Sequence, residues 1–174
     1  VVGNPPWAQV AAPNKGGRTA EPWLSALQTF LQRELSASRG GMYARAGLRW
    51  AFQDLFVQRG VQLTDSELAL VLPATFLTNS QSWLSRRLLQ TTCPMRELHC
   101  YDERATKDLF PEVTLAACTL RASKTQRGEL TLARNCSLED LDGQAQQVPS
   151  AYVCEANRYL VPAVSPSCPA VFAK

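Results

Sequence analysis

Residues 93–100 read CPMRELHC and open the stretch of sequence that says most about the fold. All six cysteines of this 174-residue chain lie between residues 93 and 168, and none precedes them. An even number of cysteines in a segment of modest hydrophobicity predicts a framework of disulfides. We therefore expect three bonds among six residues, which are Cys93, Cys100, Cys118, Cys136, Cys154 and Cys168.

The pairing of these cysteines is open, because six cysteines allow fifteen arrangements. Our working hypothesis is sequential pairing: Cys93 with Cys100, Cys118 with Cys136, and Cys154 with Cys168. Since disulfides persist in oxidising compartments, the framework predicts a secreted or periplasmic protein. A metal site is not expected, because the chain has no CxxC pair and a single histidine.

The sequence before the cysteines predicts about four helices. Apolar residues recur with a helical period over residues 22–35 and 42–59, and Gly60 is expected to end the second helix. Residues 64–67 (TDSE) have the form of a capping box for a short helix over residues 68–72. A fourth helix should begin near residue 79 or 80, with Arg86 and Arg87 facing outward.

Beyond residue 92 the helical period fades and strands are expected. Residues 112–121 (EVTLAACTLR) and 129–134 (ELTLAR) alternate in part and predict a hairpin, and residues 151–161 predict a third strand. The predicted fold class is α+β, with an N-terminal helical subdomain followed by a small disulfide-stapled antiparallel sheet. In this division residues 22–92 are the helical part and residues 93–174 the cysteine-rich part of one domain.

Residues 1–21 are rich in Pro, Gly, Ala and Asn and are predicted to form a flexible arm. Trp7 is unusual in such a segment and could dock on the domain or on a partner. No run of eighteen apolar residues exists, so no membrane-spanning helix is expected. A signal peptide or anchor is expected to be absent from the sequence as it stands.

The basic residues are concentrated in the first half of the chain. Residues 1–90 hold nine Lys or Arg and five Asp or Glu, whereas residues 91–174 hold nine and ten. A helical surface for an acidic protein partner, or for a phospholipid headgroup, is therefore predicted. Its candidate residues are Arg39, Arg45, Arg49, Arg86 and Arg87. The pI of about 8.6 is too low for a dedicated nucleic-acid binder, so no nucleic acid is expected as a partner.

No catalytic or cofactor motif stands out, since the GxSxG and HExxH patterns are both absent. The favoured function is an exported, non-enzymatic binding or accessory protein of the cell envelope or extracellular space. A secretion or surface-appendage component and an immunity-type inhibitor are the examples we consider. The alternative is an exported hydrolase or toxin whose site uses scattered carboxylates and arginines. A pilin-like subunit is a further alternative, because Cys154 and Cys168 could close a loop that resembles the D-region of type IV pilins.

Overall fold

A computed structural model of the chain describes residues 1–7, 9–10, 26, 29–30, 50–113, 115–137, 139–149 and 152–153. Beyond residue 50, the described part contains three α-helices and one short 3-10 helix. These are α2 (Phe52–Leu63), η1 (Ala74–Leu77), α3 (Trp83–Thr92) and α4 (Glu103–Leu109). None of the described helices is long and apolar enough to cross a bilayer.

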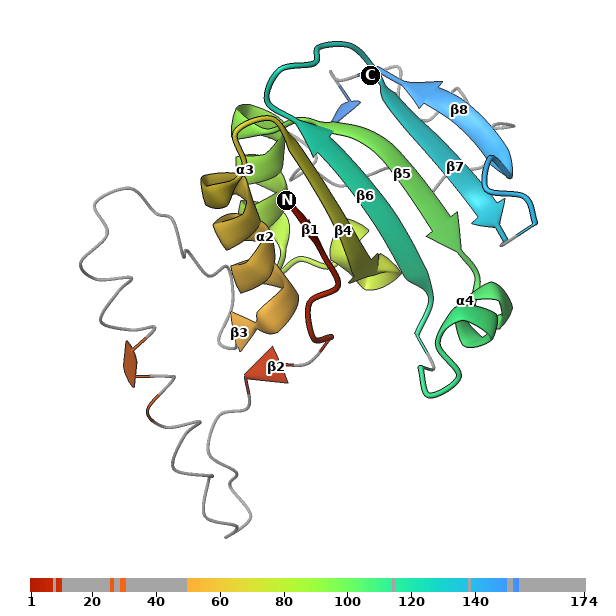
Figure 1. Cartoon of the computed structure of the whole chain (residues 1–174), viewed down its shortest axis with the longest axis horizontal. Helices are drawn as coiled ribbons and strands as arrows, with labels where there is room; N and C mark the ends of the chain where they lie inside the picture. The colour runs from red at the N-terminus through yellow and green to blue at the C-terminus, as the bar shows by residue number, and fades with distance from the viewer. Residues whose placement is uncertain are drawn as a thin grey trace, which may run out of the picture.

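A mixed sheet of six strands is the centre of the described structure (Figure 1). In spatial order its strands are β1 (Val2–Gly3), β4 (Glu67–Pro73), β6 (Ala117–Ser123), β5 (Met95–Tyr101), β7 (Leu130–Cys136) and β8 (Gln144–Val148). The β1·β4 and β5·β7 pairs are parallel, and the other pairs are antiparallel. A separate two-stranded ladder joins β2 (Gln9–Val10) to β3 (Trp50–Ala51) in antiparallel fashion.

A row of leucines crosses the middle of the sheet and forms the core. Leu70 lies opposite Leu120, Leu120 opposite Leu98, and Leu98 beside Leu132. All four side chains are at most 5% exposed. Burial of each leucine contributes roughly 1.5–3 kcal/mol, so this row fixes the register of four neighbouring strands.

Helices α2 and α3 pack on this leucine face of the sheet. Val57 and Val61 from α2 and Leu89 from α3 join the same buried cluster. Figure 1 shows the two helices together at the β1 and β4 side of the sheet, whereas α4 lies at the end of β5. A Cβ atom on Gly60 would lie 2.8 Å from Cδ1 of Leu68, so this glycine lets α2 approach β4 closely.

The prediction of four helices before a small antiparallel sheet is wrong. Residues 67–73 form the strand β4, in which buried Leu68, Leu70 and Leu72 alternate with half-exposed residues. Thr64 does not cap a new helix. Its backbone N–H donates to the Gly60 carbonyl at 3.0 Å and ends α2, which continues past Gly60 to Leu63.

Two other predicted helices meet different outcomes. The fourth is confirmed as α3, and Asn79 Oδ1 accepts from the backbone N–H groups of Gln81 and Ser82 just before it. The first, over residues 22–35, lies outside the described residues apart from residues 26, 29 and 30. The boundary between an arm and a domain at residue 21 therefore stays a prediction.

The predicted hairpin is also wrong, although both of its strands exist. Strands β6 and β7 lie within or beside the predicted segments, but β5 is inserted between them. Because β5 pairs antiparallel with β6 and parallel with β7, the sheet is mixed. The third predicted strand, over residues 151–161, lies outside the described residues apart from 152 and 153.

No disulfide joins the described cysteines, since Cys93, Cys100, Cys118 and Cys136 are all free thiols. The seven residues from Cys93 to Cys100 run largely along β5, which separates their Cα atoms by about 20 Å at the usual rise per residue. Cys118 and Cys136 lie two strands apart, at about 10 Å, which also exceeds the reach of a disulfide. The predicted pair of Cys154 and Cys168 lies outside the described residues.

Candidate functional site

The candidate site lies beyond the carboxyl ends of the parallel strands β1 and β4. The chain leaves β1 through Asn4, Pro5, Pro6 and Trp7, and it leaves β4 through η1. Parallel strands in open sheets with helical crossovers commonly place ligands beyond their carboxyl ends, where loops and helix starts converge. The β2·β3 ladder brings the segment that follows Trp7 beside the start of α2.

The two prolines hold Asn4 and Trp7 in place. Pro5 is buried, whereas Asn4 and Pro6 are exposed to solvent. Each proline ring fixes its own φ angle, and each proline restricts the residue before it to extended conformations. An exposed amide group, which both donates and accepts hydrogen bonds, is thus held at the end of a strand of the sheet.

Trp7 packs against Phe110, the residue that follows α4. Their ring centroids are 6.0 Å apart and their planes meet at 68°, which is an edge-to-face contact. Trp7 is half-buried, and it borders a small cluster formed by Tyr101, Ala117 and other residues. Two aromatic rings from distant parts of the chain therefore meet next to Pro6.

A polar cavity of about 160 Å³ lies against Trp7 on the side of α2 and α3. Its floor is formed by buried polar side chains, Gln53 and Asp54 from α2 and Ser82 at the start of α3. Its rim includes the exposed residues Thr75 and Gln81. The cavity is therefore lined by hydrogen-bonding groups below and open to solvent above.

The carboxylate of Asp54 belongs to a buried network under this cavity. Its Oδ2 atom accepts a hydrogen bond from Ser82 Oγ at 3.0 Å. Burial raises the pKa of Asp54, while the neighbouring serine hydroxyls and Arg86 act in the opposite direction. Burial likewise lowers the pKa of Arg86 to about 10, and the charge of Asp54 opposes that shift. The two groups thus form a buried pair of opposite charges.

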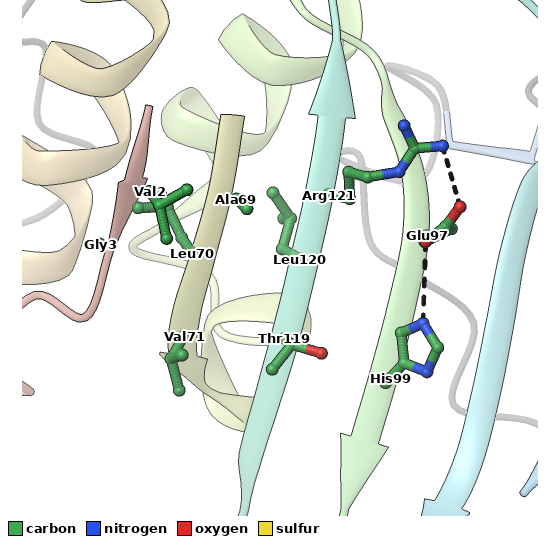
Figure 2. Close-up of a pocket in the computed structure, with 10 residues that line it drawn as sticks. All are labelled: Val2, Gly3, Ala69, Leu70, Val71, Glu97, His99, Thr119, Leu120 and Arg121. Atoms are coloured by element: carbon green, nitrogen blue, oxygen red, sulfur yellow. Dashed lines mark hydrogen bonds and ion pairs between the residues drawn. The ribbon is translucent and has the colours of Figure 1, made fainter. Parts of the chain in front are cut away.

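A second hollow, of about 230 Å³, lies on the sheet face that turns away from the leucine core (Figure 2). Arg121 contacts Glu67 at 3.0 Å and Glu97 at 2.9 Å, and His99 Nε2 lies 3.9 Å from Glu97. His99 Nδ1 is also 2.8 Å from the Leu141 carbonyl oxygen. These charged side chains pair with one another. The part of this hollow that remains for a ligand is therefore mostly apolar strand surface.

The arginines predicted to bind a partner do not form one described surface. Arg39, Arg45 and Arg49 lie outside the described residues. Arg86 was expected to face outward, but it is fully buried and its Nη1 atom donates to the Phe76 carbonyl at 2.6 Å. Arg87 is exposed, and its role in partner binding stays a prediction.

Sequence reasoning missed Asn4 and Phe110, considered Asp54 only as one of the scattered carboxylates, and assigned Trp7 to a flexible arm. A usable signal was present, because a polar residue, two prolines and an aromatic residue directly follow the short segment Val1-Val2-Gly3. A strand end can be read from that pattern, but its partner strand, 67 residues away, cannot. No cluster of three potential metal ligands occurs among the described residues.

The chain resembles solved structures in fold. No protein-family model and no curated protein sequence matches it. A structure of a type I restriction-modification (R-M) system aligns with 95% of this chain and 37% of its own, with a TM-score of 0.58 and 10% identity. A complex of DrdV with DNA aligns with 95% of this chain and 18% of its own (TM-score 0.55, 10% identity). The type IIG restriction endonuclease BpuSI aligns with 82% of this chain and 19% of its own (TM-score 0.55, 13% identity). The chain thus spans only 18% to 37% of the length of these proteins.

These findings overturn the expected function and location. The prediction of an exported envelope protein, secreted or periplasmic, was based on disulfides that the four described cysteines do not form. The three solved structures described above are a type I restriction-modification system, a complex of DrdV with DNA and a type IIG restriction endonuclease, and they give no support to an envelope component, an inhibitor or a pilin. The prediction that nucleic acid is not a partner, which was inferred from the pI, is also wrong, since one protein of this fold is seen bound to DNA.

Proposed function

We propose that the chain forms the base-binding part of a DNA-modifying enzyme, in which a nucleobase leaves the duplex and binds at Asn4, Trp7 and Phe110. The observation that carries the proposal is the prolyl segment at the carboxyl end of β1, with Trp7 packed against Phe110 at 6.0 Å. The fold shared with restriction-modification enzymes supports DNA as the substrate.

The chemistry of the segment suits an extruded base. Enzymes that react with a base take it out of the stack and bind it by stacking and by hydrogen bonds to its edge. An aromatic ring such as that of Trp7 contributes roughly 1–3 kcal/mol by stacking on a base. The amide of Asn4 offers a donor and an acceptor side by side, the pattern with which asparagine pairs with adenine. Adenine is therefore the base that we assign to the site.

Methyl transfer from a sulfonium methyl donor to the amino nitrogen of adenine is the reaction that fits a modification enzyme of this kind; the donor leaves as a thioether and the nitrogen loses one proton. Among base-extruding enzymes, glycosylases remove the base and deaminases change its pairing, whereas methyltransferases mark it and leave it in the duplex. A mark of this kind is what a modification activity needs. Asn4 would orient the amino group, and Trp7 would hold the plane of the ring.

Binding of short single-stranded oligodeoxyadenylate, followed by fluorescence anisotropy, tests this proposal. Trp7→Ala should weaken binding by about tenfold or more, which corresponds to loss of roughly 1.4 kcal/mol of stacking. Asn4→Ala should reduce the preference for oligodeoxyadenylate over oligothymidylate. The matched control is Phe56→Ala, because Phe56 is an aromatic residue on α2 that is 49% exposed and does not line the cavity beside Trp7. Equal losses in Trp7→Ala and Phe56→Ala would refute the assignment.

A further inference from the structure

The cavity beside Trp7 contains buried polar atoms that lack partners among the described residues. These atoms are Trp7 Nε1, Gln53 Oε1 and Asp54 Oδ1. Gln53 and Asp54 are each 8% exposed, so neither side chain can turn to bulk solvent. The three residues that carry these atoms, one donor and two acceptors, all line the same cavity.

Leaving these polar atoms without hydrogen-bond partners costs free energy of folding unless water or a ligand occupies the cavity. A buried polar atom without a partner costs roughly 1–3 kcal/mol, and native proteins contain few of them. The cavity volume of about 160 Å³ exceeds the share of one water molecule, roughly 30 Å³, several times. The space therefore suits a small organic group as well as a cluster of waters.

The charges around the cavity favour a neutral occupant. The carboxylate of Asp54 already interacts with the positive charge of the buried Arg86 guanidinium. A cationic ligand would leave a net positive charge in a buried region, and an anionic ligand would face the Asp54 carboxylate. A neutral group that donates two hydrogens and accepts one avoids both costs.

We propose that this cavity is a binding site for a neutral planar group that carries an NH₂ donor beside an acceptor atom. Its two hydrogens would bond to Asp54 Oδ1 and Gln53 Oε1, and its acceptor would receive the indole N–H of Trp7. A primary carboxamide and an amino-substituted nitrogen heterocycle share this pattern. The site shares Trp7 with the proposed base site, but neither Asn4 nor Phe110 lines the cavity. It goes beyond base binding and does not depend on DNA.

NMR titration of the full chain, followed through the indole N–H signal of Trp7, tests this site. Nicotinamide represents the carboxamide and adenine the amino heterocycle. Nicotinic acid and purine are the matched controls, because each keeps the ring and lacks the NH₂ group. We expect nicotinamide, adenine or both to shift the Trp7 signal in a saturable way, and the controls to bind about tenfold more weakly. Trp7→Phe identifies the signal, because it removes one indole.

A variant separates this site from the proposed base site. Gln53→Met keeps the size of the side chain and removes the acceptor. It should therefore weaken probe binding about tenfold, while the melting temperature stays close to that of the wild type. Asn4→Ala should leave probe binding intact. Absence of any saturable shift, meaning that water alone fills the cavity, would overturn the proposal, as would equal binding of the acid and the amide. Loss of oligodeoxyadenylate binding in Asn4→Ala would be a separate result on the base site.

Discussion

Replacing Arg86 by Met should destabilise the fold strongly, because this arginine is fully buried between α3 and η1. The change removes the donor to the Phe76 carbonyl and leaves the buried Asp54 carboxylate without its opposite charge. Removal of one partner of a buried ion pair costs about 3–5 kcal/mol. With a urea dependence of roughly 2 kcal/mol per molar, the unfolding midpoint should fall by about 2 M.

Two further variants locate the cause of this effect. Arg87→Met, at the exposed neighbouring position, should change stability by at most about 0.5 kcal/mol. Adding Asp54→Asn to Arg86→Met should recover part of the loss, because the unbalanced charge is then gone. Burial raises the pKa of Asp54, so the charged form costs stability as pH rises through that pKa. The deficit of Arg86→Met should therefore be smaller near pH 4 than at pH 7.

Similar urea midpoints for the variants at positions 86 and 87 would refute the structural role assigned to Arg86. A deficit in Arg86→Met that does not change with pH or with the second substitution would also count against it. In that case the loss would come from packing alone, and the Asp54 carboxylate would not be the group that Arg86 balances.

Three other predictions concern the sheet. Burial raises the pKa of the Cys100 thiol from 9.0 to about 11, so stability that is complete below pH 9 should fall by about 2–3 kcal/mol between pH 9 and pH 11. Denaturation at several pH values checks this, and an equally steep fall in Cys100→Ala would contradict it. Gly143→Ala should cost more than about 1 kcal/mol, because its φ is +44° and a Cβ would clash with the Arg134 carbonyl oxygen. A melting temperature of Gly143→Ala equal to that of the wild type would argue against that turn geometry. Leu98→Ala, in the central leucine row, should cost about 2–5 kcal/mol in urea denaturation, and a cost below 1 kcal/mol would place it outside the core.

Local patterns predicted some elements correctly. The helical period around residues 83–92 indicated α3, and the partial alternation in residues 117–121 and 130–134 indicated β6 and β7. The run ELALVLP was assigned to a helix because a short, continuous apolar run is compatible with a buried helix or a buried strand. Its neighbours in the sheet, which decide between the two, lie far away in the sequence.

Long-range pairing and composition explain the remaining errors. The insertion of β5 between β6 and β7 requires a parallel pair that no turn signal marks. Six cysteines indicated disulfides, but thiols buried in a sheet behave as small apolar side chains. The candidate site was hidden because Pro5 and Pro6 gave its segment the composition of a flexible arm. Only the pairing of β1 with β4 shows that Asn4 and Trp7 stand at the end of a strand.

The location of the bound base is the central claim, and photo-crosslinking measures it directly. An oligonucleotide that carries 8-azidoadenine is irradiated in complex with the chain, and the modified peptide is identified by mass spectrometry. The account predicts crosslinks to the peptide that contains Asn4 and Trp7, or to the one that contains Phe110, and their loss in the presence of excess oligodeoxyadenylate. Crosslinks confined to the opposite sheet face, at residues such as His99 and Thr119, would contradict it.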